Sequence, residues 1–238
     1  MCNPDESPEL RYVIYDLQST NGIKVNNESR ESFALRDGDR IQLGNIVCKF
    51  TIVDSIESNF LKEIKNLIEY DDRTKLLQIQ PFYDRLEKSL EACAAKNSTV
   101  SVLMMDLDGL KQINDRHGHP MGTEVIVRIA NLISEEMSPS GVVAMYGGDE
   151  FSAYLEDTTG AEAFERADRL RTLVSEMRFA DKGIADRVTI SIGIASYPGD
   201  GAEMMQIVAN ADRALFFAKA QGKNRVVVFD SDMAEVQD

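Results

Sequence analysis

The chain has 238 residues, 43% hydrophobic and 28% charged, which is typical of a globular protein and excludes a disordered one. A formal net charge of -14 argues against a nucleic-acid-binding surface, so a nucleotide site would need a local basic cluster. The sequence has no apolar run of membrane-spanning length and no signal-peptide core, so we expect a cytoplasmic protein without a membrane contact. Its cysteines are scattered without metal-ligand spacing: Cys2, Cys48 and Cys93.

Residues 1–53 are predicted to form a small, partial β-sandwich. Residues 1–9 are polar and rich in proline. Short runs of β-branched and aromatic residues then alternate with turn residues, which is typical of sandwich strands. Strands are expected at residues 12–15, 23–25, 41–43 and 46–53.

Two segments of this region, residues 16–22 and 35–44, resemble the second half of a forkhead-associated (FHA) domain. Such domains bind phosphothreonine peptides, and Thr20 and Asn21 match the family's peptide-contacting pair. The family's Gly-Arg and Ser-x-x-His motifs, which carry most of the phosphate grip, would lie upstream, where this chain has no room for them. Without that arginine we expect Thr20 and Asn21 to form a tight turn rather than to bind a phosphothreonine peptide.

Residues 54–70 are predicted to form a helix, because apolar residues recur at three- and four-residue spacing. The stripe comprises Ile56, Phe60, Leu61, Ile64, Leu67 and Ile68. It is too short for an isolated coiled coil. Two interpretations remain open: a connecting helix that pairs in a dimer, or a helix lying on its own domain.

Residues 71–238 alternate between strand and helix patterns. Strands are expected at residues 100–105, 142–143, 151–155, 188–195 and 226–229. Helices are expected after Pro81 and at residues 109–116, 121–137, 159–178 and 202–220. The inward face of the fourth helix is predicted to hold Ala163, Phe164, Ala167, Leu170 and Val174.

A β-hairpin is predicted around Gly147 and Gly148, because glycine tolerates the positive φ angles of a tight turn. Asp149 and Glu150 then project from a rigid tip whose neighbours lack side chains, which leaves room for phosphates and a hard cation. The simpler alternative is a hairpin with solvated acids.

The segment Tyr146-Gly147-Gly148-Asp149-Glu150-Phe151, with Asp106-Leu107-Asp108 upstream, resembles the signature of GGDEF domains, the diguanylate cyclase family. The stretch from Lys111 to His119 continues the family pattern, as do residues 211–225. The resemblance implies an α/β (α+β) fold: the ferredoxin-like palm of nucleotide cyclases, whose central sheet contains antiparallel strands. It also implies that a homodimer condenses two GTP molecules into cyclic di-GMP and releases pyrophosphate.

Matched residue by residue, the family implies a site with two Mg²⁺ ions. Asp106, the carbonyl of Leu107 and Asp149 would hold the metals. Asp149 would also act as the base, with Glu150 beside it. The alternative for Asp106 is helix capping, which we expect to be the main role of Asp108.

The same match implies the substrate contacts. Lys111 would reach phosphate and Asn114 the guanine edge. Lys219 and Lys223 would clamp the β- and γ-phosphates, unless they lie on a solvated helix face. His117 and His119 form no expected metal pair, and His119 is predicted to be a structural hydrogen-bonder.

Several positions depart from the family pattern. Thr123 replaces an aspartate that contacts guanine, which implies either relaxed base choice, with ATP also used to make cyclic AMP-GMP, or weakened binding in a decaying enzyme. Met145 replaces an arginine, and Ser138-Pro139-Ser140-Gly141 replaces the product-inhibition motif Arg-x-x-Asp, so that inhibitory site should be absent. Further departures lie in the segment that opens the domain: Arg73, Lys75, Gln78 and Ile79.

These departures leave two alternatives to a cyclase. The first is a degenerate GGDEF domain that binds GTP without turnover. The second is a phosphopeptide adaptor that acts through the FHA-like part.

Overall fold

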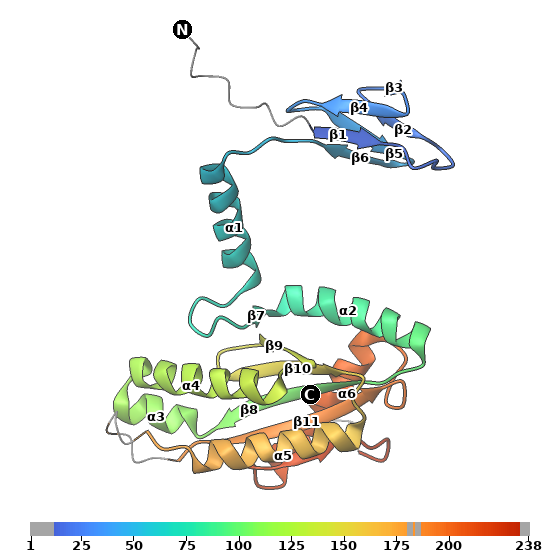
Figure 1. Ribbon diagram of the computed structural model, residues 1–238. Helices are drawn as coiled ribbons and strands as arrows, with labels where there is room; N and C mark the ends of the chain where they lie inside the picture. The colour runs from blue at the N-terminus through green and yellow to red at the C-terminus, as the bar shows by residue number, and fades with distance from the viewer. Residues whose placement is uncertain (1–11, 180–182, 184–186, 234–238) are drawn as a thin grey trace. The chain divides into compact units, whose positions relative to one another are not determined.

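The computed structural model describes residues 12–179, 183 and 187–233 and divides the chain into two compact units, Met1–Ile64 and Lys65–Asp238 (Figure 1). The polar segment at residues 1–9 and Cys2 lie outside the described residues. Within the described part, no helix is both long and apolar enough to cross a membrane.

The first unit contains two antiparallel sheets. β1 (Tyr12–Tyr15) pairs with β4 (Ser32–Leu35). The second sheet has the order β3-β2-β5-β6, formed by Glu28–Ser29, Ile23–Val25, Arg40–Leu43 and Ile46–Lys49. The last strand ends at Lys49, earlier than the predicted residue 53, although the N–H of Phe50 still donates to the Asp39 carbonyl (2.7 Å). The N–H of Ile52 donates to the Asp37 carboxylate (2.8 Å).

Thr20 and Asn21 lie in a turn. The N–H of Gly22 donates to the Ser19 carbonyl (3.3 Å), and both Thr20 and Asn21 are exposed. Asn21 also lines a shallow pocket of about 290 Å³ together with Lys24. The tight turn predicted from the sequence is therefore confirmed, and the expectation that this turn does not bind a phosphothreonine peptide stays a prediction.

α1 (Ser55–Glu69) buries none of its residues. Its predicted apolar stripe is exposed along its whole length, from 37% at Ile64 to 78% at Ile56. Exposed apolar area on this scale is unfavourable in water, so the stripe is a surface that a partner could cover.

The second unit is built on a six-stranded mixed sheet in the order β12-β11-β8-β10-β9-β7. The central strand β8 (Val100–Asp108) pairs antiparallel with β10 (Glu150–Glu156) and β11 (Thr189–Tyr197). β9 (Gly141–Met145) completes the hairpin with β10. The two edge strands are parallel to their neighbours: β12 (Val226–Val228) pairs with β11, and β7 (Leu77–Gln78) pairs with β9. The predicted fold class is confirmed, whereas β7 was not predicted.

Helices cover both faces of this sheet (Figure 1). On one face α2 (Ile79–Lys96) and α6 (Met204–Ala220) enclose a core with Phe82 and Tyr154. On the other, α4 (His119–Met137) and α5 (Gly160–Glu176) enclose a larger core with Ile129 and Ile192. The short helix α3 (Leu110–His117) follows β8 directly. Strands with apolar residues on both faces form such sandwiched sheets, and all nine residues of β8 are buried.

α5 begins with a capping box that fixes its start. The Thr159 hydroxyl accepts from the Glu162 N–H (3.4 Å), and the Glu162 carboxylate accepts from the Thr159 N–H (2.9 Å). Four of the five predicted inward residues are buried, but Phe164 is 40% exposed, so that prediction was wrong. Phe164 stands next to Ala163 and therefore points about 100° away from the buried stripe.

The turn that opens the second unit is held by one carboxylate. Asp71 accepts from the N–H groups of Arg73 (3.2 Å) and Thr74 (2.9 Å) and from the Thr74 hydroxyl (2.8 Å). Burial raises the pKa of Asp71, but these hydrogen bonds outweigh burial and hold it below its ordinary value. Lys75, where the family pattern has glycine, has a left-handed φ of +59°.

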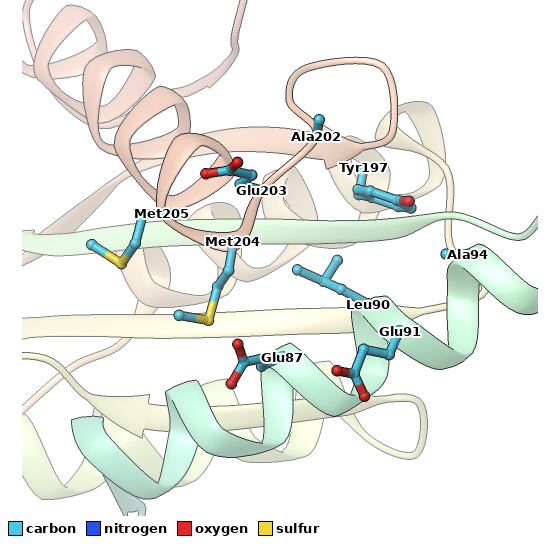
Figure 2. A pocket seen from close by; sticks show the side chains of 9 residues that line it. All are labelled: Glu87, Leu90, Glu91, Ala94, Tyr197, Ala202, Glu203, Met204 and Met205. Carbon is cyan, nitrogen blue, oxygen red and sulfur yellow. The ribbon is translucent and has the colours of Figure 1, made fainter.

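A surface pocket of about 450 Å³ lies between the C-terminal half of α2 and the beginning of α6. Figure 2 shows Leu90 and Met204 at its floor and the carboxylates of Glu87, Glu91 and Glu203 around it. The pocket is at the beginning of α6, whereas Lys219 is near its end, roughly 21 Å away at 1.5 Å per residue. The hollow is therefore separate from Lys219 and the other predicted site residues at that end of α6.

Replacing Lys75 with glycine is expected to stabilise the second unit. A left-handed residue with a Cβ costs roughly 1–2 kcal/mol, part of which the flexibility of glycine cancels in the unfolded chain. The lost Lys75–Asp72 ion pair is exposed and contributes little. We expect a gain of about 0.5–1 kcal/mol in the free energy of unfolding by urea titration.

The matched control is Asn97→Gly, because Asn97 also has a left-handed φ (+53°) at the end of α2. Asparagine tolerates this conformation, so the control should change stability little. An equal gain in both variants would show that Lys75 carries no particular strain.

Candidate functional site

The acidic residues of the predicted site meet where β8 ends and β10 begins. The antiparallel register sets Glu150 directly opposite Asp106. The N–H of Leu107 donates to the Asp149 carbonyl (3.2 Å), which fixes the hairpin tip against β8. The structure therefore brings four residues together where these two central strands meet, at the end of β8 and the beginning of β10. This place is called the β8–β10 edge, and its residues are Asp106, Leu107, Asp149 and Glu150.

The two hairpin glycines provide space rather than an unusual backbone. Neither Gly147 nor Gly148 has a left-handed φ, so the turn-geometry argument made from the sequence was wrong. A Cβ on Gly147 would lie 2.7 Å from the Glu150 carboxylate, which folds over it. A Cβ on Gly148 would meet nothing within 4 Å, so the surface there is open. Gly148 thus leaves an uncovered stretch of backbone beside the carboxylates.

Negative charge exceeds positive charge at this edge. Asp106 is 8% exposed and forms an ion pair with Lys219 of α6. Burial is the largest cause that raises the pKa of Asp106. The contact with Lys219 lowers it, and the charges of Asp149 and Asp108 add a smaller increase, so the net shift is upward. Burial and the charge of Asp106 likewise raise the pKa of Glu150. Three carboxylates facing one ammonium group favour an additional cation.

The donor set fits Mg²⁺, which prefers carboxylate and carbonyl oxygens and retains water. Asp106 and Asp149 supply carboxylates. Leu107 follows Asp106 on β8, and its N–H donates to the Asp149 carbonyl. Among the described residues there is no group of three or more His, Cys, Asp and Glu side chains that could hold a metal alone. The protein therefore offers part of a coordination shell that a phosphate group and water would complete.

Asn114 is held by the close approach of α3 and α4. It is half-buried, and a Cβ on the buried Gly122 would overlap its side-chain amide. The Asn114 amide therefore lies against bare helix backbone in a fixed position. On α4, the helix that contains Gly122, the Thr123 hydroxyl donates to the His119 carbonyl (3.1 Å). The Thr123 oxygen consequently presents only lone pairs to its surroundings.

The remaining predicted cations lie around the same edge. Lys111 is exposed in the first turn of α3. Lys219 is buried enough, at 34% side-chain exposure and paired with Asp106, to exclude a solvated helix face. Lys223 is exposed just past the end of α6, in a left-handed turn with φ +64°.

Asp108 caps no helix, so the predicted capping role was wrong. The residue before α3 is Gly109, with φ +87°, and no side chain caps this helix. The Asp108 carboxylate points instead to β11, where it accepts from Ser191 (3.0 Å) and Thr189 (2.9 Å). The sequence carries a signal for this arrangement: hydroxyl residues alternate along β11 opposite the β8 acids.

The departures at Met145 and Gly141 lie on β9, where Met145 is buried and Gly141 is partly buried. Met145 is 7% exposed and packs in the core between the sheet and α4. A Cβ on Gly141 would lie 2.5 Å from the Met137 carbonyl and 2.7 Å from Leu155. An aspartate at position 141, as in the family's product-inhibition motif, would therefore not fit this backbone.

Of the two histidines, His119 is the exposed first residue of α4, and its carbonyl accepts from Thr123. His117, the last residue of α3, is half-buried. The described residues show no metal cluster that includes either one.

The contact between Gly122 and the Asn114 amide can be tested by adding a methyl group at position 122. Glycine-to-alanine changes inside helices normally stabilise by about 0.5–1 kcal/mol. We expect Gly122→Ala to lose this gain because the new methyl group displaces the Asn114 amide. In an Asn114→Ala background the same change should stabilise, giving a coupling energy of roughly 1 kcal/mol in a double-mutant cycle by urea unfolding. Additive effects would mean that the two residues do not touch.

Comparison with known proteins shows a consistent family. A family model described as "Diguanylate cyclase, GGDEF domain" matches residues 68–225, and an FHA domain model matches residues 3–44. Diguanylate cyclase A of Treponema denticola is 36% identical over 98% of this chain and 67% of its own length. The bifunctional diguanylate cyclase/cyclic di-GMP phosphodiesterase MucR of Pseudomonas aeruginosa is 35% identical over 172 residues. The matched segment is 72% of this chain and 25% of MucR.

Solved structures show the same likeness. The coiled coil and GGDEF domain of DgcB from Caulobacter crescentus, in complex with c-di-GMP, superposes with a TM-score of 0.68 at 25% identity, covering 73% of this chain and 92% of DgcB. The GGDEF domain of YfiN (TpbB) from Pseudomonas aeruginosa superposes with a TM-score of 0.65 at 32% identity, covering 68% and 94%. The similarity falls on the unit that carries the carboxylate edge.

Proposed function

The chain belongs to the GGDEF domain family of diguanylate cyclases, and we propose that it condenses two GTP molecules into cyclic di-GMP with release of two pyrophosphates. The observation that carries this proposal is the excess of carboxylates at the β8–β10 edge beside the uncovered backbone of Gly148. That edge is acidic enough for divalent cations and open enough for a triphosphate. The nucleotide substrate is consistent with the cytoplasmic location that we also propose.

Asp106, the Leu107 carbonyl and Asp149 would hold two Mg²⁺ ions together with the triphosphate. When bound, these ions neutralise phosphate charge and acidify the attacking 3′-hydroxyl. Asp149 would accept the proton from that hydroxyl, and Glu150 would keep the metal-binding edge negative. Lys219 is already beside Asp106, within reach of a phosphate bound there.

The other charged and polar groups would position the substrate. Lys111 and Lys223 are exposed, and in this proposal they donate to phosphate oxygens. Asn114, fixed against Gly122, would donate and accept at the guanine edge.

One domain would bind one GTP, so two copies must face each other for condensation. We propose residues 54–70 as the connecting helix between FHA-like residues 1–53 and the cyclase domain, residues 71–238. The exposed apolar stripe of α1 supports a homodimer, because pairing two stripes would remove that area from water.

The decisive test is turnover by the purified chain. With GTP and Mg²⁺ we expect cyclic di-GMP and pyrophosphate by chromatography. Asp149→Ala should lower kcat at least about 100-fold because it removes both the base and a metal ligand. Glu135→Ala, which removes an exposed carboxylate on α4, is the matched control and should leave kcat unchanged. GTP binding without turnover in the unmodified chain would instead indicate a degenerate, non-catalytic domain.

Base choice depends on Thr123. Guanine presents donors at N1 and its 2-amino group, whereas adenine N1 is an acceptor. Because the Thr123 hydroxyl already donates to the His119 carbonyl, its free lone pairs suit guanine. Relaxed selectivity with ATP would require this hydroxyl to turn away from its helix.

We therefore expect GTP alone and a GTP–ATP mixture to give cyclic di-GMP as the main product. Thr123→Val should raise the KM for GTP by roughly 3–10-fold, as expected for one lost hydrogen bond. Abundant cyclic AMP-GMP from the mixture would show that the hydroxyl reorients and that base choice is relaxed.

A further inference from the structure

A buried carboxylate that is not among the proposed metal ligands joins three distant parts of the domain. Asp108, the last residue of β8, is 7% exposed. Its Oδ2 accepts from the Thr189 hydroxyl (2.9 Å), the Ser191 hydroxyl (3.0 Å) and the backbone N–H of Asn224 (3.1 Å). Oδ1 accepts from Ser191 as well (3.0 Å). Both oxygens thus accept hydrogen bonds, as expected for a buried polar group.

The bond to Asn224 holds an unfavourable turn. Gly222, Lys223 and Asn224 follow α6 with φ values of +113°, +64° and +48°. Two consecutive left-handed residues with side chains persist only where their surroundings fix them. The Lys223 N–H donates to the Ala218 carbonyl (3.0 Å), which ends the helix. The next N–H, that of Asn224, is the one that Asp108 holds.

Strand β8 therefore contacts both regions that carry a lysine near the end of α6, Lys219 and the turn with Lys223. Asp106 pairs with Lys219, and Asp108, two residues further along β8, holds the turn that carries Lys223. Residues i and i+2 of a strand project from the same face about 6.6 Å apart. The spacing between the metal-binding carboxylate and the Lys223 turn is thus set inside a single buried strand.

We infer that Asp108 is a positioning residue that fixes Lys223 for phosphate binding by holding the Asn224 N–H. The inference rests on the proposed function only for its kinetic consequence. Asp108 itself touches neither metal nor nucleotide in this role. Its substitution should consequently weaken substrate binding through Lys223 rather than remove the chemistry.

Kinetics with GTP separate positioning from a merely structural role. Asp108→Ala is expected to raise the KM for GTP about 5–20-fold, with a smaller change in kcat, because a loosened turn presents Lys223 less often. Asp108→Asn keeps an oxygen for the Asn224 N–H and should recover most of the KM. The matched control Thr189→Val removes a donor to the same carboxylate but leaves the turn bond intact, so it should lower the unfolding midpoint without changing KM.

A double-mutant cycle then tests whether Asp108 acts through Lys223. In a Lys223→Ala background, Asp108→Ala should raise KM no further. Multiplicative effects, or a KM that Thr189→Val changes as much as Asp108→Ala does, would overturn the inference.

Amide hydrogen exchange without nucleotide tests the contact independently of turnover. We expect Asp108→Ala to accelerate exchange at Asn224 at least tenfold relative to the unmodified chain, and Thr189→Val to leave it within about twofold. If the unmodified chain makes no cyclic di-GMP, the proposed function fails but this measurement still decides the contact. Unchanged exchange at Asn224 in Asp108→Ala would overturn the inference even in an active cyclase.

Discussion

The antiparallel register between β8 and β10 is the constraint on which the functional edge depends. Glu150 is paired with Asp106, and the Asp149 carbonyl accepts from Leu107, so acidic residues from positions over forty apart in sequence must share one small volume. Burial, with a smaller contribution from neighbouring carboxylates, raises the pKa values of Asp106 and Glu150, which means that holding these groups charged is unfavourable. The buried apolar residues of β8 and β10 provide the free energy that keeps the register fixed. A divalent cation would relieve the repulsion, so the stored electrostatic cost favours ligand binding.

Missing side chains shape the site as much as charged ones. A Cβ on Gly193 of β11 would overlap the backbone of α6 at Leu215, so the helix lies directly on the strand. This close approach brings Lys219, one turn further along α6, to Asp106. Gly122 does the same for the Asn114 amide, and Gly148 leaves the hairpin tip uncovered. In each case a glycine without a side chain leaves the space that a neighbouring polar group or helix occupies or that stays open to solvent.

Much of the fold could be predicted from the sequence because its periodicities are strong. The alternation of Val188, Ile190, Ile192 and Ile194 correctly placed one face of β11 in the core. The hairpin and the longer helices were located to within a few residues for the same reason. β7 has only two residues, too few to show any periodicity, and it exists because Leu77 and Gln78 pair with β9. Phe164 was misplaced because hydrophobicity alone does not distinguish a buried stripe from its neighbour.

The errors at the site have a common physical origin. The sequence pattern shows which residues are acidic or small but does not show which partners they meet in space. Asp108 has the position of a helix cap, yet its hydrogen-bond donors come from residues 81, 83 and 116 positions later. The hairpin glycines suggested a left-handed turn, yet what they provide is room beside Glu150. Such non-local relations become predictable only when the strand order is known.

The departures from the family pattern at Lys75, Met145 and Gly141 lie away from the carboxylates, which is consistent with the proposed cyclase activity. Lys75 stands in a left-handed turn that suits glycine, and Met145 is packed into the core. Gly141 is enclosed so closely that the acid of a product-inhibition motif has no space. None of these three positions contributes a charge to the edge where Asp106 pairs with Lys219 and stands opposite Glu150. Thr123 is the departure that the proposed guanine contact involves. Its hydroxyl donates to the His119 carbonyl, which leaves its lone pairs as acceptors. A substitution at any one of the three carboxylates would reduce the excess of negative charge on which the proposed cation site depends.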